Sequence, residues 1–193
     1  ATVNQFVQMN IKNKTYQKLD MGPWNHSGRR TGETFAGDVD FGNDARYGIQ
    51  GYGKQRLRWF DRWLKNISNG VENEPPVKIF VMGGGNGNKN KNGKLNHGGE
   101  WRFEQEWPLA RTQFTPYYLH STGQANSLLG DGTLSVDPPV DEPSDRYVYN
   151  PAFPTPTKGG CNCCNPEIVD WGAFDQRSVE FRNDVLVYTS EPL

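Results

Sequence analysis

The chain has 193 residues and a net charge of −1, with 21 basic and 22 acidic side chains, a balance that does not favour a nucleic-acid partner. Its apolar runs are too short for a transmembrane helix, so no membrane partner is expected. Only 34% of the residues are hydrophobic, but six tryptophans supply large rings for a core, and 22 glycines and 13 prolines favour a β-rich fold with many turns.

The first motif of chemical interest lies near the start of the chain. Residues 5–9 are expected at the end of a helix, and residues 14–19 are expected to form a short strand. That strand leads into Met21–Gly28, which reads Met-Gly-Pro-Trp-Asn-His-Ser-Gly. Gly and Pro fix a tight backbone, Trp24 offers an apolar wall, and His26 can change its charge near neutral pH. His26 is therefore a candidate catalytic base, and the alternative is a structural histidine in a loop.

The next segment changes from loop to helix. Residues 29–43 are polar and rich in glycine, which indicates a loop. A helix is predicted over residues 54–67, with Asn43 or Asp44 able to cap its start and Asn69-Gly70 suited to its end. We expect the helix to pack against a sheet through apolar residues at three- and four-residue spacing: Ile49, Tyr52, Leu57, Phe60, Trp63, Leu64 and Ile67.

A domain boundary is predicted near residues 70–76, where prolines follow the helix. This gives one domain over 1–72 and a second over 73–193. Strand patterns between turn clusters are typical of a β-sandwich, with a proline-rich connector, residues 138–156, extended over the sheet. The strands are expected at residues 77–82, 113–120, 178–182 and 184–189.

Residues 83–99 form a low-complexity stretch of Gly, Asn and Lys. A phosphate-binding loop is one interpretation, but the G-x-x-x-x-G-K-S/T pattern is missing, and a long flexible hairpin insertion is favoured. The insertion contains His97, which we expect to be solvated. His120 lies on a predicted strand and is expected to be a half-buried structural residue.

Cys161, Cys163 and Cys164 lie close together in the sequence. They could be free thiols in a loop, a disulfide with one thiol left over, or part of a metal site. A fourth ligand at the spacing of a zinc finger is missing, so no metal and no cofactor are expected.

The sequence does not show the other residues that a catalytic histidine would need. The sequence has no G-x-S-x-G nucleophile elbow and no H-E-x-x-H motif. The chain opens without Met or a signal-peptide pattern and ends just after the strand predicted at 184–189, so we interpret it as a fragment of a longer protein. The cellular compartment therefore stays open.

Met21–Gly28 resembles the catalytic-histidine motif of the CocE/NonD family of α/β-hydrolases, which includes esterases, acylases and X-prolyl dipeptidyl-peptidases. Further segments resemble motifs of this family and follow in the family's order. They are Arg58–Lys65, Pro75–Gly83, Glu100–Pro108, Tyr117–Ser121, Pro154–Gly160 and Phe174–Thr189. Together they cover the chain from about residue 16 to its end.

The resemblance implies a mixed fold. Residues 1–72 would be the C-terminal remnant of an α/β-hydrolase domain, made of a strand, the histidine loop and a helix. Residues 73–193 would be an incomplete, mostly β jelly roll of the galactose-binding-like type, as in the C-terminal domain of X-Pro dipeptidyl-peptidases.

The resemblance also implies a mechanism. It is acyl transfer by Ser, His and Asp on a small-molecule ester, amide or peptide, with His26 as the base and Trp24 as a wall of the substrate pocket. The nucleophile and the triad acid precede the motif in the family, and Asp20 does not match the acid. This chain alone is therefore expected to be inactive, and a homo-oligomer is a further possibility. The alternatives are a structural brace or a carbohydrate-binding module that uses Trp101, Trp107 and Tyr147.

Overall fold

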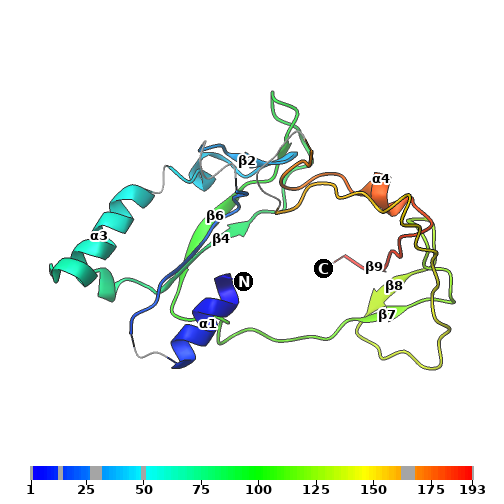
Figure 1. Ribbon diagram of the computed structural model, residues 1–193, viewed down its shortest axis with the longest axis horizontal. Coiled ribbons are helices and arrows are strands. Elements are labelled where there is room, and N and C mark those ends of the chain that lie inside the picture. Colours follow the sequence, from blue (N-terminus) through cyan, green and yellow to red (C-terminus); the bar gives the residue numbers. More distant parts are fainter. Residues whose placement is uncertain (1, 13–14, 27–31, 49–50, 162–167, 193) are drawn as a thin grey trace. The chain divides into compact units, whose positions relative to one another are not determined.

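The computed structural model describes residues 2–12, 15–26, 32–48, 51–161 and 168–192 (Figure 1). The chain divides into two compact units. Unit 1 comprises Ala1–Thr112 with Gly159–Ala173, and unit 2 comprises Gln113–Lys158 with Phe174–Leu193. No helix in the described part of the chain is long and apolar enough to cross a membrane.

The central sheet of unit 1 has the strand order β1-β4-β6. β1 (Leu19–Met21) runs parallel to β4 (Val77–Met82), and β6 (Gly99–Glu104) pairs antiparallel with the other edge of β4. The strand predicted at 77–82 is confirmed, and the strand predicted at 14–19 is displaced toward the C-terminus. The pairing of β1 with β4 brings the candidate histidine loop next to the start of the predicted second domain.

One face of this sheet carries the main apolar core. α1 (Thr2–Lys12) buries Phe6 against Leu19, Val77 and Ile79. Side chains alternate between the two faces of a strand, so Asp20 and Lys78, which are paired in register, lie on the opposite face. The helix expected near residues 5–9 is confirmed. Because of this alternation along the strands, Asp20 and Lys78 point away from the apolar core and are available for a functional site.

α3 (Tyr52–Lys65) confirms the predicted helix within two residues at each end. It begins after Gly51 and ends at Asn66, both in the left-handed conformation, so the caps expected from Asn43 or Asp44 and from Asn69-Gly70 are wrong. Tyr52, the first residue of α3, is buried.

The expected packing of the α3 apolar face against a sheet is also wrong for the described residues. Four large apolar residues of the helix, and Ile67 just after it, are between 42% and 77% exposed; those of the helix are Leu57, Phe60, Trp63 and Leu64. α3 is joined instead to η2 (Val71–Asn73) and to Glu74, the residue after it, by ion pairs of Arg62 with Glu72 and of Arg58 with Glu74. The helix is thus held by these ion pairs and by ring contacts of Tyr16 with Trp59 and Trp63, while much of its apolar face stays exposed.

The loop predicted at 29–43 contains two short strands in its described part. β2 (Phe35–Ala36) and β3 (Val39–Asp40) form a tight antiparallel pair, and η1 (Asn43–Ala45) follows. At Gly37, φ is +67° and an added Cβ would lie 2.3 Å from the carbonyl oxygen of Ala173. Glycine therefore permits the close approach of Ala173 to this pair.

The 83–99 insertion connects β4 to β6 as a hairpin, as predicted, but it is bonded along its length. Its strand β5 (Leu95–Asn96) pairs with β3, and Asn90 donates a hydrogen bond of 2.6 Å to Asp40. His97 is half-buried and not fully solvated as expected, since its Nδ1 atom is buried and its ring lies 5.6 Å from that of Phe41. The ordered contacts arise because the insertion adds a strand to the sheet of β2 and β3.

Unit 2 is built on the sheet β7-β8-β9. β7 (Tyr118–His120) pairs antiparallel with β8 (Thr133–Ser135), which runs parallel to β9 (Thr189–Ser190). The strands predicted at 113–120 and 184–189 are therefore much shorter than expected.

The strand predicted at 178–182 is wrong, because α4 (Arg177–Glu180) occupies most of that range. Its amides from Val179 and Glu180 bond back to the carbonyl of Gln176, which closes a helical turn. The connector at 138–156 has no helix or strand, as expected.

The mixed α and β class is confirmed. Because the described strands form three separate three-stranded sheets, the jelly-roll sandwich stays a prediction. The boundary at residue 72 also stays a prediction, since the compact units describe contacts within this chain and divide it elsewhere.

Candidate active site

Trp24 is positioned by the backbone just before it. β1 ends at Met21, and an added Cβ on Gly22 would lie 2.4 Å from the Trp24 ring. Glycine is thus required for the ring to fold back over the strand end. The indole Nε1–H of Trp24 donates a hydrogen bond to the carbonyl of Ala45.

Aromatic rings surround Trp24 on several sides. It meets Tyr47 and Tyr52 edge to face, with ring centroids 5.0 and 5.1 Å apart, and these two tyrosines stack at 4.2 Å. Trp101 lies 5.6 Å away and donates its own N–H to the carbonyl of Asp44. Offset and edge-to-face pairs of this kind are favourable, so the cluster forms a rigid wall.

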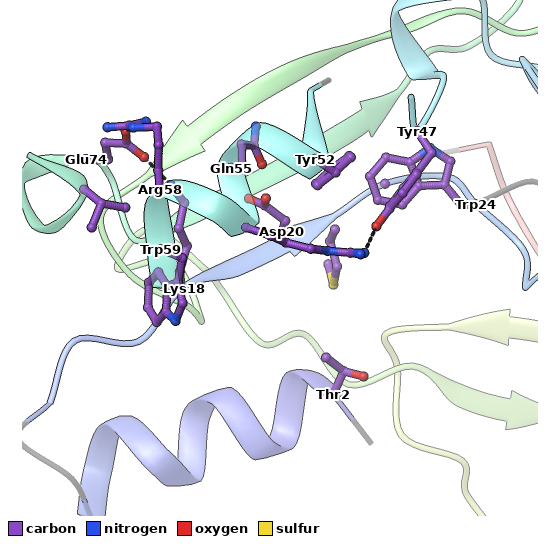
Figure 2. A pocket seen from close by; sticks show the side chains of 14 residues that line it. Thr2, Lys18, Asp20, Trp24, Tyr47, Tyr52, Gln55, Arg58, Trp59 and Glu74 are labelled. Atoms are coloured by element: carbon purple, nitrogen blue, oxygen red, sulfur yellow. Dashed lines mark hydrogen bonds and ion pairs between the residues drawn. The ribbon is translucent and has the colours of Figure 1, made fainter. Parts of the chain in front are cut away.

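This wall bounds a cavity of about 490 Å³ (Figure 2). The cavity lies between β1, the first turns of α3 and the segment that leads into β4. Its lining combines rings with charged side chains, among them Lys18, Asp20, Trp24, Tyr47, Tyr52, Arg56, Arg58, Trp59 and Glu74. The size and the mixed lining suit a small organic molecule.

Ion pairs close one end of the cavity (Figure 2). Glu74 accepts hydrogen bonds from Lys18 and from Arg58, the latter at 2.5 Å. Partial burial acts to raise the pKa of Glu74, but the bonds from Lys18 and Arg58 outweigh it, and the pKa lies below its usual value. Glu74 is therefore a structural carboxylate at neutral pH.

Asp20 reaches the cavity from β1 and is electrostatically different. Its Oδ1 atom is buried without a hydrogen-bond partner, and burial raises the pKa of this carboxyl against the opposing effects of Lys18 and Lys78. The hydroxyl of Tyr52 is also buried without a partner, and burial together with Asp20 raises its pKa. The cavity thus has two polar atoms that the described protein does not satisfy.

Lys78 lies beside Asp20 on β4 and is only 6% exposed. Its ammonium group is 4.4 Å from the centroid of the Trp101 ring and 5.9 Å from that of Tyr52. Burial lowers the pKa of Lys78, while Asp20 acts to raise it. From the sequence, Asp20 was considered only as a triad acid and Lys78 was not singled out, although a charged residue inside each apolar strand was the available signal.

The predicted site residues are only partly brought together. Trp24 lines the cavity, as a pocket wall requires, but its role toward a substrate stays a prediction. His26 lies at an exposed turn two residues further on and is not among the residues that line the cavity. Ser27 and Gly28, the end of the motif, lie outside the described residues. The structure therefore leaves the imidazole open toward solvent, and its catalytic role also stays a prediction.

The other candidate residues have simpler positions. Trp101 and Trp107 pack inside unit 1, whereas Tyr147 is 57% exposed. Cys161 is an exposed free thiol, and Cys163 and Cys164 lie outside the described residues. Among the residues that the structure describes, no group of three or more His, Cys, Asp or Glu side chains could hold a metal ion.

Fold and site together define a β-rich domain that follows a short segment of helix and strand with an aromatic cavity. Residues 69–193 match the family described as the X-Pro dipeptidyl-peptidase C-terminal non-catalytic domain, and the chain belongs to this family. The resemblance to the CocE/NonD serine hydrolases is thereby confirmed, together with the relatives described next.

The chain is similar to three proteins named as esterases. Cocaine esterase from Rhodococcus sp. (strain MB1 Bresler) is 37% identical over 183 residues, which is 95% of this chain and 29% of that protein. Proteins of Mycobacterium bovis and Mycobacterium tuberculosis that carry provisional serine-esterase names are each 26% identical over 186 residues, 91% of this chain and 23% of theirs. The chain thus spans less than a third of the length of these relatives.

Proposed function

We propose that this chain is the C-terminal part of a serine hydrolase that cleaves esters by acyl transfer. The observation that carries this proposal is the 37% identity to cocaine esterase over almost the whole chain. The two mycobacterial relatives also carry esterase names, which favours esters over amides and peptides as the first substrates to test. The serine and the acid of the triad would come from sequence that the longer relatives have and this chain lacks.

His26 is proposed as the base of that triad. It would take the proton of the serine hydroxyl during attack on the acyl carbon and return it to the leaving alcohol. Its exposed position two residues after the cavity wall supports this role, because a nucleophile from another segment can approach the ring. Trp24 is proposed as an apolar wall against which the acyl group or the leaving group packs.

Residues 1–72 are proposed as the end of the α/β-hydrolase domain. One observation supports this assignment. The apolar face of α3 is uncovered, and a helix with such a face is stable when another element covers it. The missing strands of the hydrolase sheet would cover it.

Residues 73–193 are proposed as a jelly-roll domain that braces the catalytic part without reacting itself. The family match begins at residue 69, close to the proposed boundary, and its description names a non-catalytic domain. The packing of Trp101 and Trp107 inside unit 1 disfavours a carbohydrate platform built on these rings.

The test uses the full-length protein that contains this sequence, assayed with p-nitrophenyl esters, amino acid esters and Xaa-Pro anilides. His26→Ala and His26→Gln should each lower kcat by about 10³-fold or more, because triad members act as a unit. His97→Gln, which changes a histidine outside the cavity, should retain activity. A His26→Ala enzyme with normal turnover would refute the role of His26, and a full-length protein inactive on every ester would refute the proposed function.

A further inference from the structure

An extended segment in unit 2, residues 137–145, crosses the end of the β7-β8 pair. We call it the strap. It contains three prolines, Pro138, Pro139 and Pro143, which restrict its backbone and remove amide donors. Its attachment therefore depends on the side chains that contact it.

His120, the last residue of β7, holds the strap at two points. Its Nδ1 atom is 2.7 Å from Oε1 of Glu142, and its Nε2 atom is 2.9 Å from the carbonyl oxygen of Asp137. The Nε2 atom is also 3.0 Å from Oγ of Ser135 on β8, which in turn accepts a hydrogen bond from the amide of Asp137. One imidazole thus joins both strands to the strap.

The oxygens of Glu142 and Asp137 favour one protonation state of the ring. A carboxylate oxygen and a carbonyl oxygen are both acceptors, so hydrogen bonds to both of them need a hydrogen on each ring nitrogen, whereas a neutral ring can satisfy Nε2 only by accepting from the Ser135 hydroxyl. Only the imidazolium carries hydrogen on both nitrogens. In this state the ring cannot take a proton from Ser135, so the Ser135–His120–Glu142 arrangement is a charged clamp and not a nucleophile with its base.

The charges around the ring agree with this geometry. The hydrogen bond with Glu142 raises the pKa of His120 above its usual value, and Asp137 adds to the effect. The same hydrogen bond lowers the pKa of Glu142. The strap thus contributes Glu142 and Asp137 beside the ring, and β8 contributes the uncharged Ser135.

We propose that His120 is a pH-dependent switch that holds the strap on β7 and β8 while it is an imidazolium and releases the strap when it loses a proton. A neutral ring has a single N–H, so either Glu142 or the Asp137 carbonyl loses its donor and faces a lone pair. The strap is therefore held at pH values below the raised pKa of His120, and it is released as the pH rises through that pKa.

The release would begin at one end of the strap. Asp145, at the other end, accepts hydrogen bonds from Ser121 Oγ at 2.7 Å, from the Ala125 amide at 2.8 Å and from the Tyr188 hydroxyl. These bonds do not involve a histidine and persist near neutral pH, because the bond from Tyr188 lowers the pKa of Asp145. Movement would therefore be confined to the residues between Asp137, which lies just after β8, and Asp145.

The strap also borders a cavity of about 390 Å³ that reaches Leu119 and Tyr188. Pro139, Glu142 and Pro143 of the strap are part of its lining. Release of the strap would change the shape of this open hollow, because residues of the strap form part of its lining.

The experiment follows the ring and the strap together by NMR in the isotope-labelled chain. The chain has three histidines, so the imidazole signals are few, and His120→Gln assigns the one from His120. His120 should titrate above the usual value near 6.5. The amide of Ser121, which bonds to Glu142 Oε2 at 3.2 Å, should lose hydrogen-exchange protection at the same midpoint. The amide of Ala125 should keep its protection.

The variant Glu142→Gln tests whether the carboxylate of Glu142 sets the titration midpoint of His120. It should lower the midpoint of His120 by about half a pH unit, the scale of a screened ion pair, and the loss of Ser121 protection should move with it. Asp141→Asn, which neutralises the neighbouring carboxylate of the strap, should leave the midpoint in place.

Two results would overturn the proposal. One is constant Ser121 protection across the titration of His120, and the other is an unchanged midpoint in a folded Glu142→Gln protein. Should that variant fail to fold, the wild-type protein decides through the coincidence of the two midpoints.

Discussion

Val77 is the side chain on which the core of unit 1 depends most. It is fully buried between β1 and β6 and contacts the cluster of Phe6, Leu19 and Ile79. Val77→Ala deletes two buried methyl groups, which removes about 1.5 kcal/mol of transfer free energy. The cavity left behind raises the loss of unfolding free energy to about 2–3 kcal/mol, because flanking β-strands allow little collapse.

Urea unfolding followed by tryptophan fluorescence measures this loss. All six tryptophans lie in unit 1, so the signal reports the unit that contains the change. Leu64→Ala is the control, since it deletes a larger group from a site that is 77% exposed and should cost no more than about 0.5 kcal/mol. A Val77→Ala protein that loses less than Leu64→Ala would refute the assignment of this cluster as the core.

Two further outcomes test the cavity wall and its ion pairs. Gly22→Ala should displace the Trp24 ring, which lies 2.4 Å from the new Cβ position, and cost about 1–3 kcal/mol with a loss of near-ultraviolet circular dichroism. Unchanged dichroism would contradict this packing. Glu74→Gln should cost about 0.5–1 kcal/mol at pH 7 by breaking the pairs with Lys18 and Arg58. Because the folded pKa of Glu74 is lowered, this difference should be present above pH 4.5 and vanish as the pH falls through the folded value in urea titrations. A difference that persists in strong acid would contradict the reasoning.

The elements that follow from local periodicity were predictable. The spacing of apolar residues gave α3 within two residues, and the apolar run at 77–82 gave β4. Periodicity shows which face of a helix is apolar, however, and not whether any element covers that face. The exposure of Leu57 and Leu64 could therefore not be read from the pattern.

The short strands and the charged pair depend on pairing between distant segments. β2 and β3 have two residues each, too few for any pattern, and they exist because Gly37 turns the chain sharply. Asp20 and Lys78 meet because β1 and β4 pair in register, which the sequence of either strand alone does not specify. Trp24 was found from its local motif, which needs no such information.

The parallel pairing of β1 with β4 bears on how the chain is made. Leu19 finds its partner only at Val77, and β6 then closes the other edge of β4. On the ribosome, α1 and β1 emerge long before the strand that they must join. Until β4 has left the exit tunnel, Leu19 cannot reach its partner Val77, so this pairing is completed only after the whole of α3 has been made.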